Sequence, residues 1–219
     1  MTNSSDSVED YLGAILRLQR DRSIPLPLSQ LQEHFGFSPI SIHEMVQKLA
    51  QKGLAEYFPY KGVCLTAKGE KSASSLVRRH RIWEFFLTKE LNVPIDEAHT
   101  LAGNLEHAAP DWVTERLFDH LGQPEACPHG SEIASQKEQA KGDCLADTVV
   151  GQTILINRIS PENPASLRVA RQSGLMPGKI VKIISRSESD LSFLMDDQNK
   201  TLLTKDSAFF WGKVQLDGA

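Results

Sequence analysis

Residues 25–54, PLPLSQLQEHFGFSPISIHEMVQKLAQKGL, decide how the first part of this chain folds. They predict a short helix over residues 28–35 that ends at Gly36. A longer helix follows: Ser38 opens it, a proline holds its first helical position and Gly53 ends it. Two helices joined by a turn of three or four residues that contains glycine are typical of a helix-turn-helix motif.

Two strand-like runs follow this motif directly, over residues 54–58 and 63–66, with the turn PYKG between them. A hairpin in this place is a wing, so we predict a winged helix-turn-helix. Between Phe37 and Ile82 the chain carries eight basic and three acidic residues, a net charge of +5 inside a protein of net charge -4. A local basic stripe of this kind indicates a phosphate-binding face. The alternative is a helical hairpin with a packing role only.

The start of the second helix is the part that we expect to face base edges in DNA. The candidate residues for this contact are Ser38, Pro39, Ser41, His43 and Glu44. Lys48 and Lys61 are expected to meet phosphates. Glu44 could accept a hydrogen bond from a cytosine amino group, but a solvated helix residue explains it nearly as well.

Helical spacing of apolar residues also predicts helices on both sides of the motif. The expected ranges are residues 7–20, 67–91, 94–108 and 110–121. The helix over residues 67–91 is apolar over more than one narrow stripe. A second subunit commonly buries the extra surface of such a helix, so we expect a homodimer.

The end of the chain changes character. Residues 126–144, ACPHGSEIASQKEQAKGDC, are polar and rich in small residues, as in a linker. Short strand-like runs and the helical segment SLRVARQSG follow, which suggests a small barrel. The strand-like runs are QTILINRI, GKIVKIISR, SFLMDD and FWGKVQL.

Composition excludes several classes of protein. The N-terminus lacks the apolar core of a signal peptide, and no run approaches the roughly 20 apolar residues of a membrane span. We therefore expect a cytoplasmic protein without a membrane partner. Cys64, Cys127 and Cys144 form no CxxC pair, so they are expected to be plain thiols. The chain has no Walker loop, GxGxxG, GxSxG or HExxH motif, so we do not expect an enzyme.

Histidines and glutamates after residue 79 form the candidate metal-binding set. His80 and Glu84 lie four residues apart and share one helical face. His99 and Glu106 share a face but lie about 10.5 Å apart along their helix, so they cannot hold one ion. Spacing alone therefore suggests one site with His80, Glu84 and His99 and another with Glu106 and His107. Solvated polar residues on amphipathic helices are the alternative. Carboxylates with imidazoles favour manganese or ferrous iron, with zinc as a competitor.

The order of EDYLGAILRL, SPISIHEMVQKLAQKGLAEYFPYKGVCLTAKG, RRHRIWEFFL, LEHAAPDWVTERLFDHLG and CPHG adds a family resemblance. It resembles the diphtheria toxin repressor and manganese transport regulator family of metal-dependent repressors, from Val8 to about Gly130. The tail, with LRVARQSGLMPGKIVKI, resembles the SH3-like barrel of ferrous iron transport accessory proteins, which longer family members also carry.

The resemblance implies a ligand at Asp10 for the site of Glu106 and His107, and it implies the triad His80, Glu84 and His99 for the second site. Glu162 in SPENPAS is the nearest candidate for a ligand from the barrel. Two positions depart from the family, because Gly13 and Gly103 stand where relatives carry ligands. The site of Asp10, Glu106 and His107 therefore lacks a side-chain ligand. Asp10 is a hard carboxylate, which favours manganese.

The expected fold is mainly α with a small β domain. The expected domains are a winged helix-turn-helix (1–74), a helical dimerisation and metal-binding domain (75–126), a linker (127–147) and an SH3-like barrel (148–219).

The resemblance implies a dimeric repressor of metal-uptake genes that binds double-stranded operator DNA when Mn(II) is bound. Fe(II) is the alternative co-repressor, and Zn(II) or other divalent ions could bind in vitro. Two other interpretations stay open. One is a winged-helix regulator switched by an organic ligand or by oxidation. The other is a metal-handling, transporter-associated protein that does not bind DNA.

Overall fold

The computed structural model describes residues 4–19, 21–133 and 142–215. The chain divides into two compact units, of which the first ends at Arg79 and the second begins at His80. Within the described ranges, no helix is long and apolar enough to cross a membrane.

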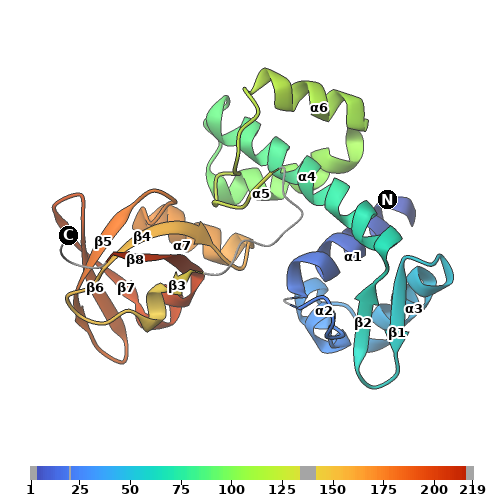
Figure 1. The fold of residues 1–219 in the computed structure, drawn as a ribbon, viewed down its shortest axis with the longest axis horizontal. Coiled ribbons are helices and arrows are strands. Elements are labelled where there is room, and N and C mark those ends of the chain that lie inside the picture. The colour runs from blue at the N-terminus through green and yellow to red at the C-terminus, as the bar shows by residue number, and fades with distance from the viewer. Residues whose placement is uncertain (1–3, 20, 134–141, 216–219) are drawn as a thin grey trace. The chain divides into compact units, whose positions relative to one another are not determined.

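The first unit is a winged helix-turn-helix (Figure 1). Its elements in chain order are α1 (Ser4–Leu18), α2 (Leu28–Phe35), α3 (Pro39–Gln51), β1 (Ala55–Phe58), β2 (Gly62–Leu65) and the start of α4 (Ala67–Lys89). The predicted motif helices and both strands of the wing are therefore present, with bounds within about two residues of those expected.

Capping residues set the bounds of the two motif helices. α2 ends at Gly36, which has a φ of 69° and donates its backbone N–H to the carbonyl of Gln32. Ser38 caps α3, since its side-chain oxygen accepts the backbone N–H of Ser41 at 3.2 Å. Proline follows at the first helical position, where its fixed φ suits the helix and its missing N–H costs nothing.

One face of α3 lies in the core of this unit. Ile42, Val46 and Leu49 are fully buried against apolar residues of α1, α2 and the hairpin. Burial of each side chain contributes about 1.5–3 kcal/mol. The other face of α3 stays exposed, including its first turn.

The wing is anchored to the segment before α2 through the first residues of β2. Val63 and Leu26 exchange two backbone hydrogen bonds of 2.9 and 3.0 Å. Gly62 is required here, because its φ is 135° and a Cβ atom would lie 2.0 Å from the carbonyl oxygen of Leu26. The turn of the wing directly precedes these residues and carries a fully exposed Tyr60.

The second unit combines helices with an antiparallel sheet. The helices are the remainder of α4, α5 (Ile95–Ala108), α6 (Asp111–His120) and α7 (Pro164–Ser173). The strands are β3 (Asp143–Cys144), β4 (Thr153–Ile159), β5 (Ile180–Arg186), β6 (Asp190–Met195), β7 (Gln198–Leu203) and β8 (Phe210–Gln215). They lie in the order β3-β8-β4-β5-β6-β7, and every pairing is antiparallel. The 3-10 helices η1 (Leu145–Asp147) and η2 (Thr204–Phe209) complete the unit.

The sheet buries alternate residues of its inner strands. In β4 and β6 the buried positions include Ile154, Ile156 and Phe193, as the period of two predicts. The sequence did not predict β7, because QNKTLL is polar and only Leu202 of it is buried. Its pairing with β6 is what makes it a strand.

The expected fold class is confirmed: the chain is mainly helical, with a winged helix-turn-helix, a helical domain and a small C-terminal β domain. A linker is expected to be exposed to solvent, but the first part of this one is buried. Cys127, His129, Ser131 and Ile133 are all buried there. Residues 134–141, in the middle of the expected linker, lie outside the described residues.

Candidate metal centre

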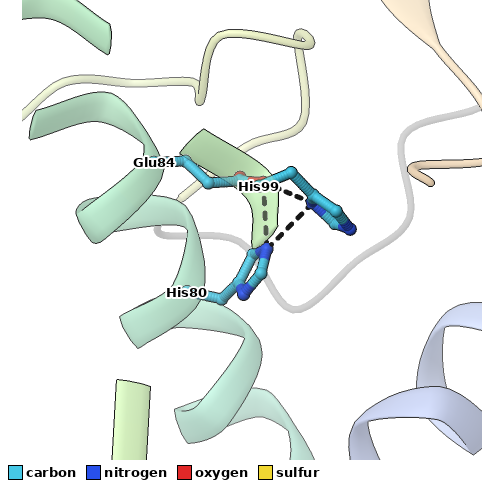
Figure 2. Close-up of side chains that lie close together, drawn as sticks. All are labelled: His80, Glu84 and His99. Carbon is cyan, nitrogen blue, oxygen red and sulfur yellow. Dashed lines mark hydrogen bonds and ion pairs between the residues drawn. The ribbon is translucent and has the colours of Figure 1, made fainter. Parts of the chain in front are cut away.

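Glu84 of α4 is the centre of a buried cluster in the second unit. Its Oε1 atom lies 2.9 Å from Nε2 of His80 and 2.7 Å from Nδ1 of His99 (Figure 2). His80 lies one turn before Glu84 on α4, whereas His99 comes from α5. The structure therefore brings together the triad that was expected from the sequence, with all its ligand atoms within 4.8 Å of one another.

A third imidazole reaches the same oxygen from outside the helices. Nε2 of His129 lies 2.8 Å from Oε1 of Glu84, and Nδ1 of His129 lies 2.8 Å from Sγ of Cys127. The turn that carries both residues is closed by two backbone hydrogen bonds of 2.9 Å, from Cys127 to Ser131 and from Gly130 to Cys127. Glu84, Cys127 and His129 form a second ligand group that shares Glu84 with the first.

Glu162 brings a further carboxylate to this region from the loop before α7. Its Oε1 atom accepts a hydrogen bond from the hydroxyl of Ser131 and lies 3.7 Å from Nη2 of Arg81. Its Oε2 atom is buried and has no hydrogen-bond partner among the described residues, and the same holds for Oε2 of Glu84. Burial of an unpaired carboxylate oxygen costs free energy, so a missing partner is expected at these atoms.

Mutual charges keep the cluster ionised. Burial acts to lower the pKa of His80, but Glu84 and Glu106 outweigh it and raise that pKa to about 9. Burial likewise opposes the charged form of His129, yet Cys127 and Glu84 hold its pKa well above the ordinary value. The pKa of Glu84 is well below its usual range because His129 and His80 outweigh the effect of burial.

The same balance applies to Glu162. Burial acts to raise its pKa, but His129 and Arg81 outweigh this effect and lower the pKa to about 2. The positive charges of the protonated imidazoles stabilise the neighbouring carboxylates, as a bound cation would. An ion entering this cluster would displace those protons, which is the usual exchange at a histidine site.

Glu106 and His107 lie further along α5. Oε1 of Glu106 is 3.5 Å from Nε2 of His107, and Oε2 of Glu106 accepts from Nδ1 of His80 at 2.5 Å. His80 therefore links Glu106 to Glu84. Asp10 lies half-buried on α1 in the first unit, so its contribution beside Glu106 and His107 stays a prediction.

The donor set fits a divalent transition-metal ion. Carboxylate, imidazole and sulfur atoms converge from α4, α5 and the 127–131 turn, and two carboxylate oxygens of the region have no hydrogen-bond partner in the described part of the chain. Cys127 makes the set softer than the oxygen and nitrogen ligands that the sequence analysis considered.

Comparisons with known proteins match this chain to a family. Residues 3–63 match the family described as "Iron dependent repressor, N-terminal DNA binding domain", and residues 66–135 match its "metal binding and dimerisation domain". A curated relative from Methanocaldococcus jannaschii, an uncharacterised HTH-type transcriptional regulator, is 33% identical over 52% of this chain and 90% of its own length. The chain belongs to the iron-dependent repressor family. Members of this family are metal-dependent, DNA-binding transcriptional repressors and not enzymes.

Longer relatives extend the similarity. The iron-dependent repressor of Mycobacterium leprae is 29% identical over 61% of this chain and 57% of its own length. A solved manganese-dependent transcriptional repressor in complex with manganese has 30% sequence identity and a TM-score of 0.83, and the match covers 95% of this chain and 100% of that one. A structure of a related protein with bound Zn2+ has 28% identity and a TM-score of 0.76, with coverage of 95% and 98%. Relatives of this repressor family thus carry different ions.

The residues expected to contact DNA lie in the first unit of this repressor. Ser38, Pro39, Ser41, His43 and Glu44 are all exposed, and so is Lys61 in the wing, whereas Lys48 is half-buried. His43 packs edge-on against Tyr57 of β1, with ring centroids 5.3 Å apart. These two rings therefore connect α3, which we call the recognition helix, to the wing.

Sequence reasoning missed Cys127 and His129 as site residues. The motif CPHG was visible, but polar and small neighbours made the segment resemble a linker. The available signal was a cysteine and a histidine two residues apart with Pro128 between them. Glu162 was named only as the nearest candidate in its loop, and the structure brings it to Ser131 and Arg81.

Proposed function

We propose that this member of the family is a dimeric repressor of metal-uptake genes, that Mn(II) is its co-repressor, and that it acts on operator DNA in the cytoplasm. One observation carries the proposal. A buried cluster of imidazoles and carboxylates, with two unpaired carboxylate oxygens, lies in the same chain as a winged helix-turn-helix with an exposed recognition helix.

In this proposal Glu84, His99, Cys127 and His129 hold one ion, with His80 or Glu162 as a further ligand. Asp10, Glu106 and His107 hold another. A bound divalent ion supplies positive charge at these places. An ion held there would replace the protons of His80 and His129, whose pKa values Glu84 helps to raise in the metal-free protein.

Asp10 gives the proposal its allosteric step. A ligand on α1 would connect the DNA-binding unit to Glu106 and His107 of the second unit. An ion that binds one arrangement of the two units more tightly shifts the population towards it. The recognition helices of a dimer would then lie about 34 Å apart, the spacing of successive major grooves.

Two observations bear on the identity of the ion. Asp10 offers a hard oxygen, and a manganese-dependent repressor with bound manganese is 30% identical to this chain. Cys127 offers a soft sulfur atom, which suits iron or zinc better. Fe(II) therefore stays the alternative co-repressor.

The test is a mobility-shift titration of the full chain on duplexes selected from its own upstream region and from random sequence. With chelator alone we expect no specific complex, and Mn(II) should restore it. If only Fe(II) activates DNA binding, the co-repressor is Fe(II) and not Mn(II), and the protein is still a metal-dependent repressor. Specific DNA binding that is equal with and without metal favours a regulator switched by an organic ligand or by oxidation. Metal binding without any specific duplex favours the metal-handling alternative.

A further inference from the structure

α7 of the C-terminal β domain packs against α5, which carries His99 and Glu106. Ile95, at the start of α5, is 7% exposed and belongs to the apolar core of the sheet. The first turn of α5 is therefore built into the β domain.

Charged residues complete this contact. Nη1 of Arg171 donates to Oε1 of Glu97 at 3.1 Å, and Nε of Arg171 lies 3.2 Å from Oδ1 of Asp96. Arg168, one turn earlier on α7, reaches within 3.9 Å of Oδ2 of Asp96. Two arginines of α7 thus face two carboxylates of α5. We call the group of Asp96, Glu97 and Arg171 the α5–α7 clamp.

Burial distinguishes this clamp from an ordinary surface ion pair. An exposed pair contributes little, because water screens it and long side chains lose entropy. The side chain of Asp96 is only 8% exposed, however, so without Arg171 it would keep a poorly compensated charge. Glu97 is 60% exposed and can be changed without creating a buried charge.

Both helices of the clamp also position candidate ligands. His99 follows Asp96 by three residues, which is close to one turn of α5. Glu162 precedes α7 by two residues. Between them Asn163 caps α7, and its side-chain oxygen accepts the backbone N–H groups of Ala165 and Ser166 at 3.1 and 3.0 Å. α7 is therefore a rigid connection between Arg171 and the loop of Glu162.

We propose that Arg171 is a positioning residue: with Asp96 and Glu97 it fixes α7 on α5, so that Glu162 reaches the Cys127–His129 turn and raises its metal affinity. This inference rests on the proposed function of the cluster as a metal site. Residues that orient ligands commonly change metal affinity by about 10–100-fold when they are replaced.

The experiment is a titration of the full chain with Co(II), followed through the charge-transfer absorption of a cobalt–thiolate bond. This absorption reports the site of Cys127 and not sites made of oxygen and nitrogen alone. We expect Arg171→Glu and Glu97→Arg each to lower the Co(II) affinity about tenfold. The double variant restores opposite charges at positions 97 and 171 but leaves the buried Asp96 beside a new carboxylate, so it should recover part of that loss.

Lys179→Glu is the matched control. Lys179 pairs with Asp196 at 2.6 Å in the same β domain, and neither residue belongs to α5 or α7. Its reversal should leave the Co(II) affinity unchanged. Circular dichroism checks that each variant keeps its helices, and Glu97→Arg at its exposed position serves if Arg171→Glu fails to fold.

Three results would overturn the inference, and the first is distinguishable from the other two. If the unsubstituted chain gives no cobalt–thiolate absorption, the metal site at Cys127 is wrong and the clamp has no role there. If the absorption forms with equal affinity in the chain and in Glu97→Arg and Arg171→Glu, the metal site stands and the clamp does not act on it. An equal loss in Lys179→Glu also contradicts a specific role of α7.

Discussion

At the scale of single residues, Glu84 has the most consequential position. One of its oxygens lies 2.7–2.9 Å from nitrogens of His80, His99 and His129, while the other has no hydrogen-bond partner within residues 4–19, 21–133 and 142–215. Both candidate ligand groups of the cluster include it. The carboxylate of Glu84 thus helps to raise the pKa values of His80 and His129, which burial alone would lower.

Glu84→Gln should therefore weaken divalent-metal binding at the cluster by more than about 100-fold, because an amide supplies no negative charge to the site. Calorimetric titration with Mn(II) and with Zn(II) measures the effect. Glu90→Gln is the control, since Glu90 is exposed just beyond the end of α4. If Glu84→Gln leaves the metal affinity unchanged, Glu84 is not a ligand of the ion.

Gly103 allows the opposite experiment. A Cβ atom at this position of α5 meets nothing within 4 Å, so a side chain fits there without displacing its neighbours. At Gly13, by contrast, a Cβ atom would lie 3.1 Å from a side-chain carbon of Leu76. Gly103→Glu should tighten metal binding by Glu106 and His107, and it should also stabilise α5 by up to about 1 kcal/mol, as replacement of a helical glycine does.

Two measurements check the Gly103→Glu variant: calorimetric Mn(II) titration and thermal unfolding with chelator present. Gly103→Ala separates the two effects, since it keeps the helix gain and adds no ligand. Equal metal affinity in both variants would show that position 103 does not face an ion.

At the scale of elements, α3 is a helix with two separate tasks. Its buried stripe of Ile42, Val46 and Leu49 fixes the helix in the first unit. Its exposed first turn, which the Ser38 cap and Pro39 define, is available to DNA. Periodicity and capping residues are local properties, which is why the sequence predicted this element and its bounds.

Lys48 tests the DNA-binding task of α3. Lys48→Ala should weaken binding to all duplexes about equally and reduce the slope of log K against log salt by roughly one unit, since one phosphate contact releases one counterion. Lys182→Ala on β5 is the control at an exposed position outside the motif. Mobility shifts over a range of salt concentrations measure the slope, and an unchanged slope would remove Lys48 from the interface.

At the scale of the whole molecule, metal must act on DNA binding through two units. The cluster around Glu84 lies entirely in the second unit, whereas the recognition helix lies in the first. Asp10 is the only proposed ligand in the first unit. Metal affinity and the coupling of metal to DNA are therefore expected to depend on different residues.

We expect His99→Ala to remove the tighter of the metal-binding events. Asp10→Ala should leave this event largely intact and abolish the metal dependence of DNA binding. The reason is that the cluster is set by the packed second unit, while closing the link to Asp10 costs ordering entropy. Paired calorimetric and DNA-binding titrations decide it, and the reverse pattern of losses would make the site of Asp10 the primary one.

Local sequence patterns predicted the winged helix-turn-helix, the helices α4 to α6 and the presence of a small β domain, because spacing, caps and turn residues act over a few positions. It also singled out His80, Glu84 and His99, since helical spacing places the first two on one face. Only the tertiary structure decided that Cys127 and His129 join Glu84, and that α7 brings Glu162 and Arg171 to the helical domain. His129 lies 45 positions from Glu84, Glu162 lies 31 positions from Ser131, and Arg171 lies 74 positions from Glu97, so no local pattern encodes their approach. The packing of the β domain against α5 is what brings Glu162 and Arg171 to the helical domain.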